Sequence, residues 1–374
     1  RLSHSRSGIT RKDVRPQNEM TMPADPKQFI LLPSIARRRY KDLLSVQQDL
    51  QKEAEKSTFN EYQKEGNQSL GIIACGIAVN YLAENFSDHK IPYPYIKITH
   101  YPIPYEQIFS LAESCRELLI LEEGYPFVEE QLKGFLPGKY TIKGRLDGSL
   151  PRDGELSPAL VANALGIEIQ DGLKVPDMVA NRPPALCNGC GHVDVYNALN
   201  EAMDQYGKGR VFSDIGCYTL GALPPFESIS SCVDMGASVT MAKGASDAGL
   251  RPAVAVIGDS TFTHSGMTGL LDAVIENTPI TVVISDNSTT GMTGGQKSSA
   301  TGRLVDICQG LGVHPDHIKT FVPLKKNHDE NVEVIRKELQ FEGVSVILAQ
   351  RECIQTAARR KRLEKKTKMA TEAK

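Results

Sequence analysis

Short runs of apolar, β-branched residues alternate with segments of helical spacing along most of this chain. Two of these runs, at 253–257 and 280–284, lead into the oxygen-bearing side chains of Asp259 and Asn287. Residues 265–276 between them space their apolar positions as a helix does, so the stretch predicts a strand–helix–strand unit of a parallel sheet. Ligands of such sheets bind at the carboxyl ends of the strands, where Asp259 and Asn287 fall.

The same alternation predicts an α/β fold with two doubly wound, parallel-sheet domains. We place the first domain at residues 67–174 and the second at residues 175–374. Residues 1–66 carry little pattern apart from a polar, helix-prone stretch at 42–56, and we expect a linker there. Further strands are expected at 70–76, 95–99, 118–123, 210–216 and 344–349, and helices at 77–86, 104–114, 126–135, 158–165, 193–206, 236–249, 303–311 and 331–341.

Composition narrows the classes of protein to consider. A formal net charge of −2 and a pI near 6.5 give no electrostatic case for binding nucleic acid or a membrane surface. The sequence contains no apolar run long enough to cross a bilayer and no secretory signal. Eight cysteines would form disulfides in a secreted protein, whereas this composition favours a cytoplasmic enzyme in which clustered cysteines more often bind metal.

Two groups of residues carry candidate chemistry. Asp259 and Asn287 are hard oxygen ligands that suit Mg²⁺ or Ca²⁺, and such an ion usually completes its coordination with phosphates. A Gly-Asp pair is more often only a turn and a helix cap, but the Asn at the end of the next strand favours the metal site. The second group contains four cysteines that can converge at one sheet edge, and four thiolates suit Zn²⁺ and [4Fe–4S] equally. These are Cys187 and Cys190 in a C-x-x-C pair, Cys217 after one strand and Cys353 after the last strand.

The Gly258-Asp259 pair, followed one strand later by Asn287, resembles the metal motif of thiamine diphosphate enzymes. The sequences that flank this motif are more specific than the motif itself. They resemble the large subunits of indolepyruvate:ferredoxin oxidoreductases, within the 2-oxoacid:ferredoxin oxidoreductase family. The stretches concerned are Ile215-Gly-Cys-Tyr-Thr-Leu-Gly, Gly258-Asp-Ser-Thr-Phe-Thr-His-Ser-Gly and Gly291-Met-Thr-Gly-Gly-Gln, and a weaker likeness runs from residue 1 to about residue 360.

This resemblance gives each segment an expected identity. Residues 1–66 would be the remnant of a preceding domain and a linker. Residues 67–174 would be a swivel domain like the C-terminal domain of transketolase, and residues 175–374 the domain that binds thiamine diphosphate and Mg²⁺. The first residue is Arg1 rather than Met, so we expect a fragment or a processed chain.

The resemblance also assigns roles to residues of the site. Mg²⁺ would be held by the side chains of Asp259 and Asn287 and by the backbone carbonyl of Thr289. A [4Fe–4S] cluster would be held by Cys187, Cys190, Cys217 and Cys353. His264 follows the metal motif and is a candidate catalytic residue, with a structural role equally open. Backbone N–H groups and hydroxyls at glycine-rich turns would bind the diphosphate, at Gly216, Gly236, Gly258, Ser260, Gly291, Thr293 and Gly294.

The expected reaction is oxidative decarboxylation of an arylpyruvate such as indolepyruvate, with coenzyme A and ferredoxin, giving an aryl-acetyl-CoA, CO₂ and reduced ferredoxin. The family also implies a small subunit, and a chain or segment that supplies the pyrimidine-binding domain with its activating Glu. Neither that Glu nor a ferredoxin-type C-x₂-C-x₂-C-x₃-C-P run is found in this sequence. The alternatives are a non-oxidative thiamine diphosphate-dependent 2-oxoacid decarboxylase with a zinc or empty cysteine site, and a non-catalytic cofactor-binding subunit.

Overall fold

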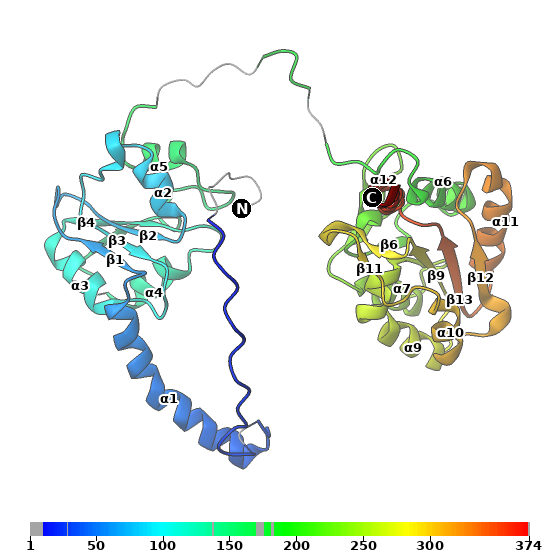
Figure 1. Cartoon of the computed structure of the whole chain (residues 1–374), viewed down its shortest axis with the longest axis horizontal. Coiled ribbons are helices and arrows are strands. Elements are labelled where there is room, and N and C mark those ends of the chain that lie inside the picture. Colours follow the sequence, from blue (N-terminus) through cyan, green and yellow to red (C-terminus); the bar gives the residue numbers. More distant parts are fainter. Residues whose placement is uncertain (1–9, 28, 137, 170–175, 181–182, 373–374) are drawn as a thin grey trace. The chain divides into compact units, whose positions relative to one another are not determined.

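The chain forms two compact units, Arg1–Val175 and Pro176–Lys374, each built around its own β-sheet (Figure 1). The structure is a computed structural model, and it describes residues 10–27, 29–136, 138–169, 176–180 and 183–372. Both sheets are covered by helices on both faces, so the predicted α/β fold with two doubly wound, parallel-sheet domains is confirmed.

The first unit contains a five-stranded sheet in the order β1-β3-β2-β4-β5. All neighbouring strands run parallel except β1, which pairs antiparallel with β3. The strands are β1 (Glu61–Gln63), β2 (Gly71–Cys75), β3 (Tyr95–Ile98), β4 (Glu117–Leu121) and β5 (Thr141–Lys143). Since β1 belongs to this sheet, the sheet begins before residue 67, from which the sequence analysis places the domain.

Helices cover this first sheet on both faces. One apolar cluster joins the sheet to α3 (Tyr105–Ser114) and α4 (Phe127–Phe135). The other joins it to α2 (Ala78–Ala83) and α5 (Pro158–Ala164). Ahead of the sheet, α1 (Pro33–Lys56) is longer than the predicted stretch and starts at a proline, whose fixed φ suits the first turn of a helix.

The second unit contains a six-stranded, wholly parallel sheet in the order β12-β13-β9-β8-β6-β7. Its strands are β6 (Val211–Ser213), β7 (Ser231–Cys232), β8 (Val254–Gly258), β9 (Ile280–Asp286), β12 (Ile318–Phe321) and β13 (Val344–Gln350). Strands β8 and β9 are buried along their whole length, as the central strands of a parallel sheet are when helices cover both faces. Their runs of apolar and β-branched residues are the reason that the sequence pattern identifies them.

Alternate residues of these strands pack against different helices. Val254 and Val256 join the cluster that contains α6 (Gly191–Met203) and α11 (His328–Leu339). Ala255 and Ile257 join the opposite cluster, because successive strand residues point to opposite faces. That opposite cluster contains α7 (Ala237–Asp247), α9 (Met267–Ile275) and α10 (Leu304–Gly310).

Shorter elements lie at the carboxyl ends of the strands. They are α8 (Asp259–Thr261), the single π-helical turn η5 (Phe262–Gly266), the 3₁₀ turns η4 (Cys217–Ala222) and η6 (Gly291–Thr293), and the hairpin β10 (Thr289–Thr290) and β11 (Gln296–Lys297). The remaining 3₁₀ turns are η2 (Ser87–His89), η3 (Asp204–Tyr206), η7 (Pro315–His317) and η8 (Lys325–Asn327).

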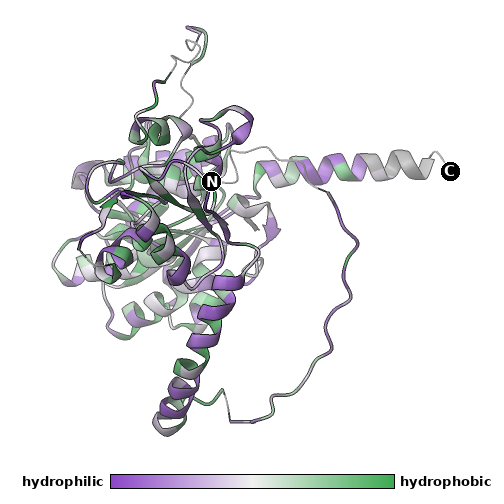
Figure 2. Cartoon of the chain, turned by 90° about the vertical axis from the view of Figure 1, so that its left-hand side faces the viewer, coloured by the Kyte–Doolittle hydropathy of each residue, from purple (hydrophilic) through white to green (hydrophobic). Residues whose placement is uncertain are grey.

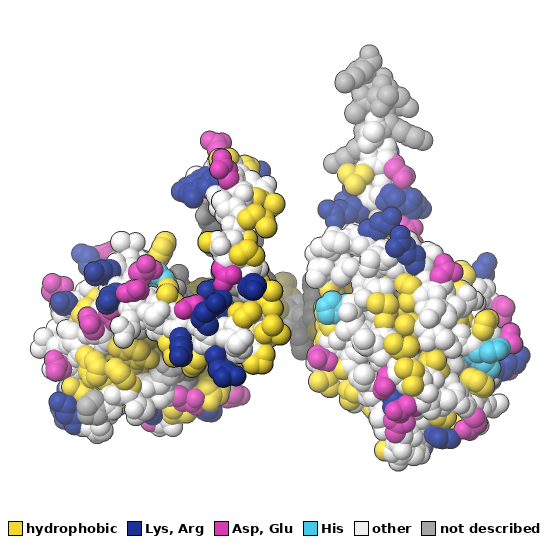
Figure 3. All heavy atoms as spheres, turned by 90° about the horizontal axis from the view of Figure 1, so that it is seen from below, with side chains coloured by type: hydrophobic (Ala, Val, Ile, Leu, Met, Phe, Trp, Pro, Cys, Tyr) yellow, Lys and Arg dark blue, Asp and Glu magenta, His cyan; other side chains and the backbone are white. Residues whose placement is uncertain are grey.

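The last helix, α12 (Ile354–Glu372), begins one residue after Cys353. It projects from the second unit and is largely hydrophilic (Figure 2). Its basic side chains gather around the base of this projection (Figure 3), and those that the structure describes as exposed are Arg359, Arg360, Lys361, Arg362 and Lys365. A search of the described residues found no helix with the length and apolarity needed to cross a membrane.

Candidate cofactor and cysteine site

The candidate site lies at the carboxyl ends of four strands of the second sheet. Asp259 follows β8 directly, Asn287 follows β9, Gly216 and Cys217 follow β6, and Cys353 follows β13. The backbone N–H of Cys353 donates to the carbonyl of Asn287 over 3.0 Å, next to a second such bond of 2.9 Å between the ends of β13 and β9. The predicted metal ligand Asn287 and the predicted cluster ligand Cys353 are therefore joined through one backbone hydrogen bond.

Asp259 is a buried carboxylate whose Oδ2 atom has no hydrogen-bond partner among the described residues. Burial raises the pKa of Asp259 to about 6, against the opposing effect of a hydrogen bond from Ser298, and the neighbouring carboxylate of Asp286 raises it further. An unpartnered buried carboxylate oxygen costs about 1–3 kcal/mol or more. A cation at this position would remove that cost, so the donor fits the expected Mg²⁺.

Asn287 and Thr289 form a tight turn at the end of β9. The Asn287 Oδ1 atom accepts a hydrogen bond from the Thr289 N–H over 3.1 Å, which leaves this oxygen one further lone pair for a cation. The hydroxyls of Ser260 and Thr290 lie 2.9 Å apart and connect the metal motif to the β10–β11 hairpin. The hairpin is therefore tied to both predicted ligand segments, α8 and the end of β9.

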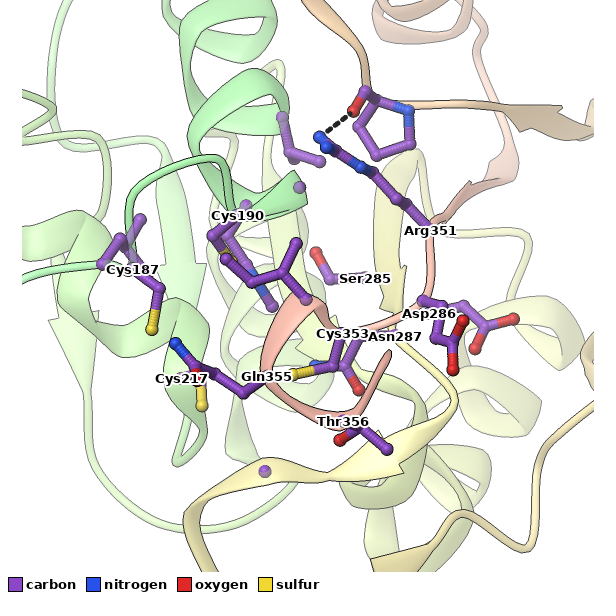
Figure 4. A pocket seen from close by; sticks show the side chains of 18 of the residues that line it. Cys187, Cys190, Cys217, Ser285, Asp286, Asn287, Arg351, Cys353, Gln355 and Thr356 are labelled. Carbon is purple, nitrogen blue, oxygen red and sulfur yellow. Dashed lines mark hydrogen bonds between the residues drawn. The ribbon is translucent and has the colours of Figure 1, made fainter. Parts of the chain in front are cut away.

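A cavity of about 260 Å³ is lined by the four predicted cysteine ligands and also by Asn287, Gly291 and Gly294. Figure 4 shows the side chains of Cys187, Cys217 and Cys353 around it. Burial is the largest cause of the raised thiol pKa of Cys190 and of Cys217, and their sulfur neighbours raise both further. Within the described residues, no group of three or more His, Cys, Asp or Glu side chains is arranged to hold a metal ion. The structure thus brings the four cysteines into one cavity without a formed coordination shell.

Three of the predicted diphosphate contacts, Gly216, Gly236 and Gly258, are glycines at points of close packing. A Cβ atom at Gly216 or Gly258 would lie 2.2 or 2.6 Å from the ring of Tyr218. A Cβ atom at Gly236 would lie 2.2 Å from the Ser265 Oγ atom, at a backbone φ of +89°. These glycines leave room for the side chains of Tyr218 and Ser265, and their contacts with the diphosphate stay a prediction.

His264 lies in the π-helical turn η5, outside the residues that line the cysteine cavity. Its exposed ring places Nδ1 3.0 Å from the Ser265 hydroxyl, which in turn donates to the Met235 carbonyl over 2.7 Å. Single π turns within helices occur frequently at functional sites. The structure therefore groups His264 with Met235 and Gly236, and the predicted catalytic role stays a prediction.

The sequence analysis missed two polar side chains of this site. Asp286 is buried beside Asp259, and its carboxylate accepts hydrogen bonds from the Ser288 N–H over 3.1 Å and from the Gln350 amide over 3.3 Å. His192 is buried in the cysteine cavity, with Nδ1 3.1 Å from the Cys190 sulfur. Burial lowers the pKa of His192 to about 4. The available signals were an Asp directly before the strand-end Asn, and a His two residues after the C-x-x-C pair.

Comparisons with known proteins identify a family for this chain. The family model for the C-terminal TPP-binding domain of thiamine pyrophosphate enzymes matches residues 214–347. The indolepyruvate oxidoreductase subunit IorA of Archaeoglobus fulgidus is 32% identical, over 98% of this chain and 62% of the relative. The IorA subunit of Methanothermobacter marburgensis is also 32% identical, over 95% of this chain and 61% of the relative. The chain thus spans about three fifths of the length of these curated relatives.

Among solved structures, a 2-oxoglutarate:ferredoxin oxidoreductase from Magnetococcus marinus matches 46% of this chain and 66% of its own chain, with 22% identity and a TM-score of 0.38.

Proposed function

The chain belongs to the family of indolepyruvate oxidoreductase IorA subunits, within the thiamine diphosphate enzymes, and from this membership we propose that it forms the diphosphate-binding part of a thiamine diphosphate-dependent 2-oxoacid:ferredoxin oxidoreductase. The observation that carries the proposal is the junction of Asn287 with Cys353, which sets a predicted metal ligand beside four cysteines in one cavity. An oxidoreductase of this class needs its electron acceptor next to its cofactor, whereas a decarboxylase does not.

The proposed substrate is an arylpyruvate such as indolepyruvate, converted with coenzyme A and ferredoxin into an aryl-acetyl-CoA, CO₂ and reduced ferredoxin. Support for this choice comes from the names of the relatives, which are indolepyruvate oxidoreductase subunits. The proposed partners are a small subunit, ferredoxin, and a chain or segment that supplies the pyrimidine-binding domain. All eight cysteines are free thiols, which fits a reducing compartment, and we propose the cytoplasm.

Thiamine diphosphate, when bound, supplies the electron sink for decarboxylation of the 2-oxoacid. The residues of this chain would hold its diphosphate through Mg²⁺ on the Asp259 carboxylate, the Asn287 amide oxygen and the Thr289 carbonyl. The N–H groups and hydroxyls around Gly258, Ser260, Gly291, Thr293 and Gly294 would bind the phosphate oxygens. Burial of Asp259 excludes water from the predicted metal ligand, which strengthens its attraction for a cation.

The four cysteines would hold a [4Fe–4S] cluster, which accepts one electron at a time. The chemistry of the donors fits this group, since four thiols from three separate segments line one cavity. Cys190 and Cys217 have raised thiol pKa values, so binding of a metal must displace their protons and becomes stronger with rising pH. The four side chains are not arranged as a metal-holding group within the described residues, so binding of a cluster would require them to rearrange.

Iron analysis after anaerobic purification tests the proposal. We expect the chain to bind iron with the broad absorbance of an iron–sulfur cluster, and each of the variants Cys187→Ser, Cys190→Ser, Cys217→Ser and Cys353→Ser to lose most of it. Cys232→Ser is the matched control, because Cys232 is exposed and does not line the cavity. This control should keep its iron.

A chain that binds no iron would refute the oxidoreductase and favour the non-oxidative decarboxylase with a zinc or empty cysteine site. Zinc analysis of the same samples distinguishes those two states. Activity toward indolepyruvate, measured with and without the partner chains, separates a catalytic subunit from a non-catalytic cofactor-binding subunit.

A further inference from the structure

We propose that His192 is a positioning residue: its Nδ1–H donates a hydrogen bond to the Cys190 sulfur, fixes that ligand and raises the reduction potential of the cluster. This inference rests on the proposed function, because it concerns a metal held by the four cysteines.

The contact is short and local. The distance from His192 Nδ1 to Cys190 Sγ is 3.1 Å. Cys190 is the residue that precedes α6, and His192 is the second residue of that helix, so the helix itself holds the two side chains together. A cysteine that binds a metal is a thiolate and has no S–H group. The proton of this hydrogen bond must therefore come from the ring, which fixes the Nδ1–H tautomer.

A second ring fixes the plane of His192. The rings of His192 and Tyr218 stack, with centroids 6.1 Å apart and planes inclined by 19°. The Tyr218 hydroxyl donates to the buried carboxylate of Asp214, and the Tyr196 hydroxyl donates to the Tyr218 carbonyl over 2.5 Å. Tyr218 directly follows Cys217, so the ring that contacts one predicted ligand is packed against the neighbour of another.

Burial of His192 is difficult to explain by packing alone. The side chain is 4% exposed, and its Nε2 atom is buried without a hydrogen-bond partner among the described residues. An apolar ring of the same shape would stack on Tyr218 without leaving a buried polar atom unpaired. Within the described residues, the sulfur contact is the one hydrogen bond of this ring, and it is what a histidine provides here and a phenylalanine does not.

The effect on the cluster follows from charge. Reduction adds negative charge to the cluster and its sulfur ligands, and an N–H donor stabilises the more negative state. A hydrogen bond becomes stronger as the negative charge on its acceptor grows, so the bond from His192 stabilises the reduced state more than the oxidised state. We therefore expect loss of the donor to shift the reduction equilibrium about tenfold, which is about 59 mV for one electron.

Two substitutions separate the hydrogen bond from the packing. His192→Phe keeps a planar ring against Tyr218 and removes the donor. His192→Asn removes the ring but keeps an amide N–H on the side chain at nearly the position of Nδ1. His314→Phe is the control, because the His314 side chain is 67% exposed and is not a lining residue of the cavity. Each full chain is purified anaerobically, its iron is measured, and its cluster is titrated potentiometrically with detection by electron paramagnetic resonance.

We expect the midpoint potential of His192→Phe to become more negative by about 59 mV, with His192→Asn much closer to wild type and His314→Phe unchanged. Equal shifts in both His192 variants would show that only packing matters and would overturn the proposal, as would the absence of any shift. Loss of iron from His192→Phe with retention in His192→Asn supports the positioning role. Loss from both variants while wild type keeps its iron overturns the donor role. Absence of iron from the wild-type chain would instead contradict the presence of the cluster, and therefore the proposed function as well.

Discussion

Asp259 and His192 are buried polar side chains that each leave one atom, Oδ2 and Nε2, without a partner among the described residues. Folded proteins satisfy most buried polar atoms, so these two atoms, like the unpartnered Ser285 hydroxyl that lines the same cavity, require an explanation. At Asp259 the proposed Mg²⁺ would supply a counter-charge, because a carboxylate without one is costly to bury. At His192 the explanation we propose is the hydrogen bond to a cysteine sulfur, the single one that the ring makes within the described residues.

Replacement of Asp259 by Asn should stabilise the metal-free chain near neutral pH. The folded-state pKa of about 6 is above the ordinary value of 3.8, so the folded chain binds the proton more tightly than the unfolded chain does. The contribution of Asp259 to wild-type stability is therefore greatest below pH 4 and is lost progressively between about pH 4 and 6. Above pH 6, Asp259→Asn should gain up to about 3 kcal/mol in unfolding free energy, and below pH 4 the gain should vanish. Urea denaturation of both chains at several pH values measures this difference in unfolding free energy.

The same variant should lose the response to cofactor. Ligands that bind only the folded state raise the melting temperature. We expect thiamine diphosphate with Mg²⁺ to raise the melting temperature of the wild-type chain and of the control Asp13→Asn, an exposed aspartate, but not of Asp259→Asn. Equal stabilisation of all three chains would show that Asp259 is not a ligand.

At the scale of elements, the start of α7 and the π turn η5 touch through Gly236. The left-handed φ of Gly236 and its close approach to Ser265 both exclude a side chain. Gly249, just after α7, has a similar φ of +94° but open space where a Cβ would lie. Substitution of each glycine by alanine can therefore separate the energetic cost of backbone strain from the cost of close packing.

Gly249→Ala should cost about 1–2 kcal/mol of unfolding free energy, the strain of a left-handed residue. Gly236→Ala should cost about 3–4 kcal/mol, because the new methyl group also forces Ser265 to move. Urea denaturation of both variants at pH 7 measures the difference. Equal losses would mean that η5 moves away from α7 without cost, and the contact would then be incidental.

Long buried elements could be predicted from the sequence, and short edge elements could not. The predicted strand at 280–284 lies within β9 (Ile280–Asp286), and the predicted helix at 303–311 contains α10 (Leu304–Gly310). The edge strands β1, β5, β7 and β12 were missed because they are short and only partly buried. Without an apolar run, such strands are defined by the pairing partner that the fold supplies.

At the scale of the whole molecule, each unit has its own apolar core. The four hydrophobic clusters each draw all of their residues from a single unit. Leu119 belongs to a cluster of the first unit, and Ile284 to one of the second, and both are at most 1% exposed. We therefore expect each unit to be stabilised by its own core.

Calorimetry of the full chain should resolve two unfolding transitions. Leu119→Ala should lower the midpoint temperature of only one transition, and Ile284→Ala that of only the other. Each shift should correspond to a loss of about 2–5 kcal/mol in unfolding free energy, since each substitution leaves a cavity in a separate core. Leu271→Ala is the control, because Leu271 is 40% exposed, and it should lower neither transition by a comparable amount. A single transition that both core variants lower would contradict independent cores.

The sequence alone determined the strand–helix–strand unit, the Asp259 and Asn287 pair and the C-x-x-C cysteines, because each is written in one local stretch of chain. The tertiary structure decided that Cys353 lies one hydrogen bond from Asn287, that Tyr218 stacks on His192, and that the Asp259 Oδ2 atom is buried with no partner among the described residues. These relations depend on the order β13-β9-β8-β6 in the sheet. That order follows from how all the apolar faces are buried together, so no local stretch of sequence specifies it.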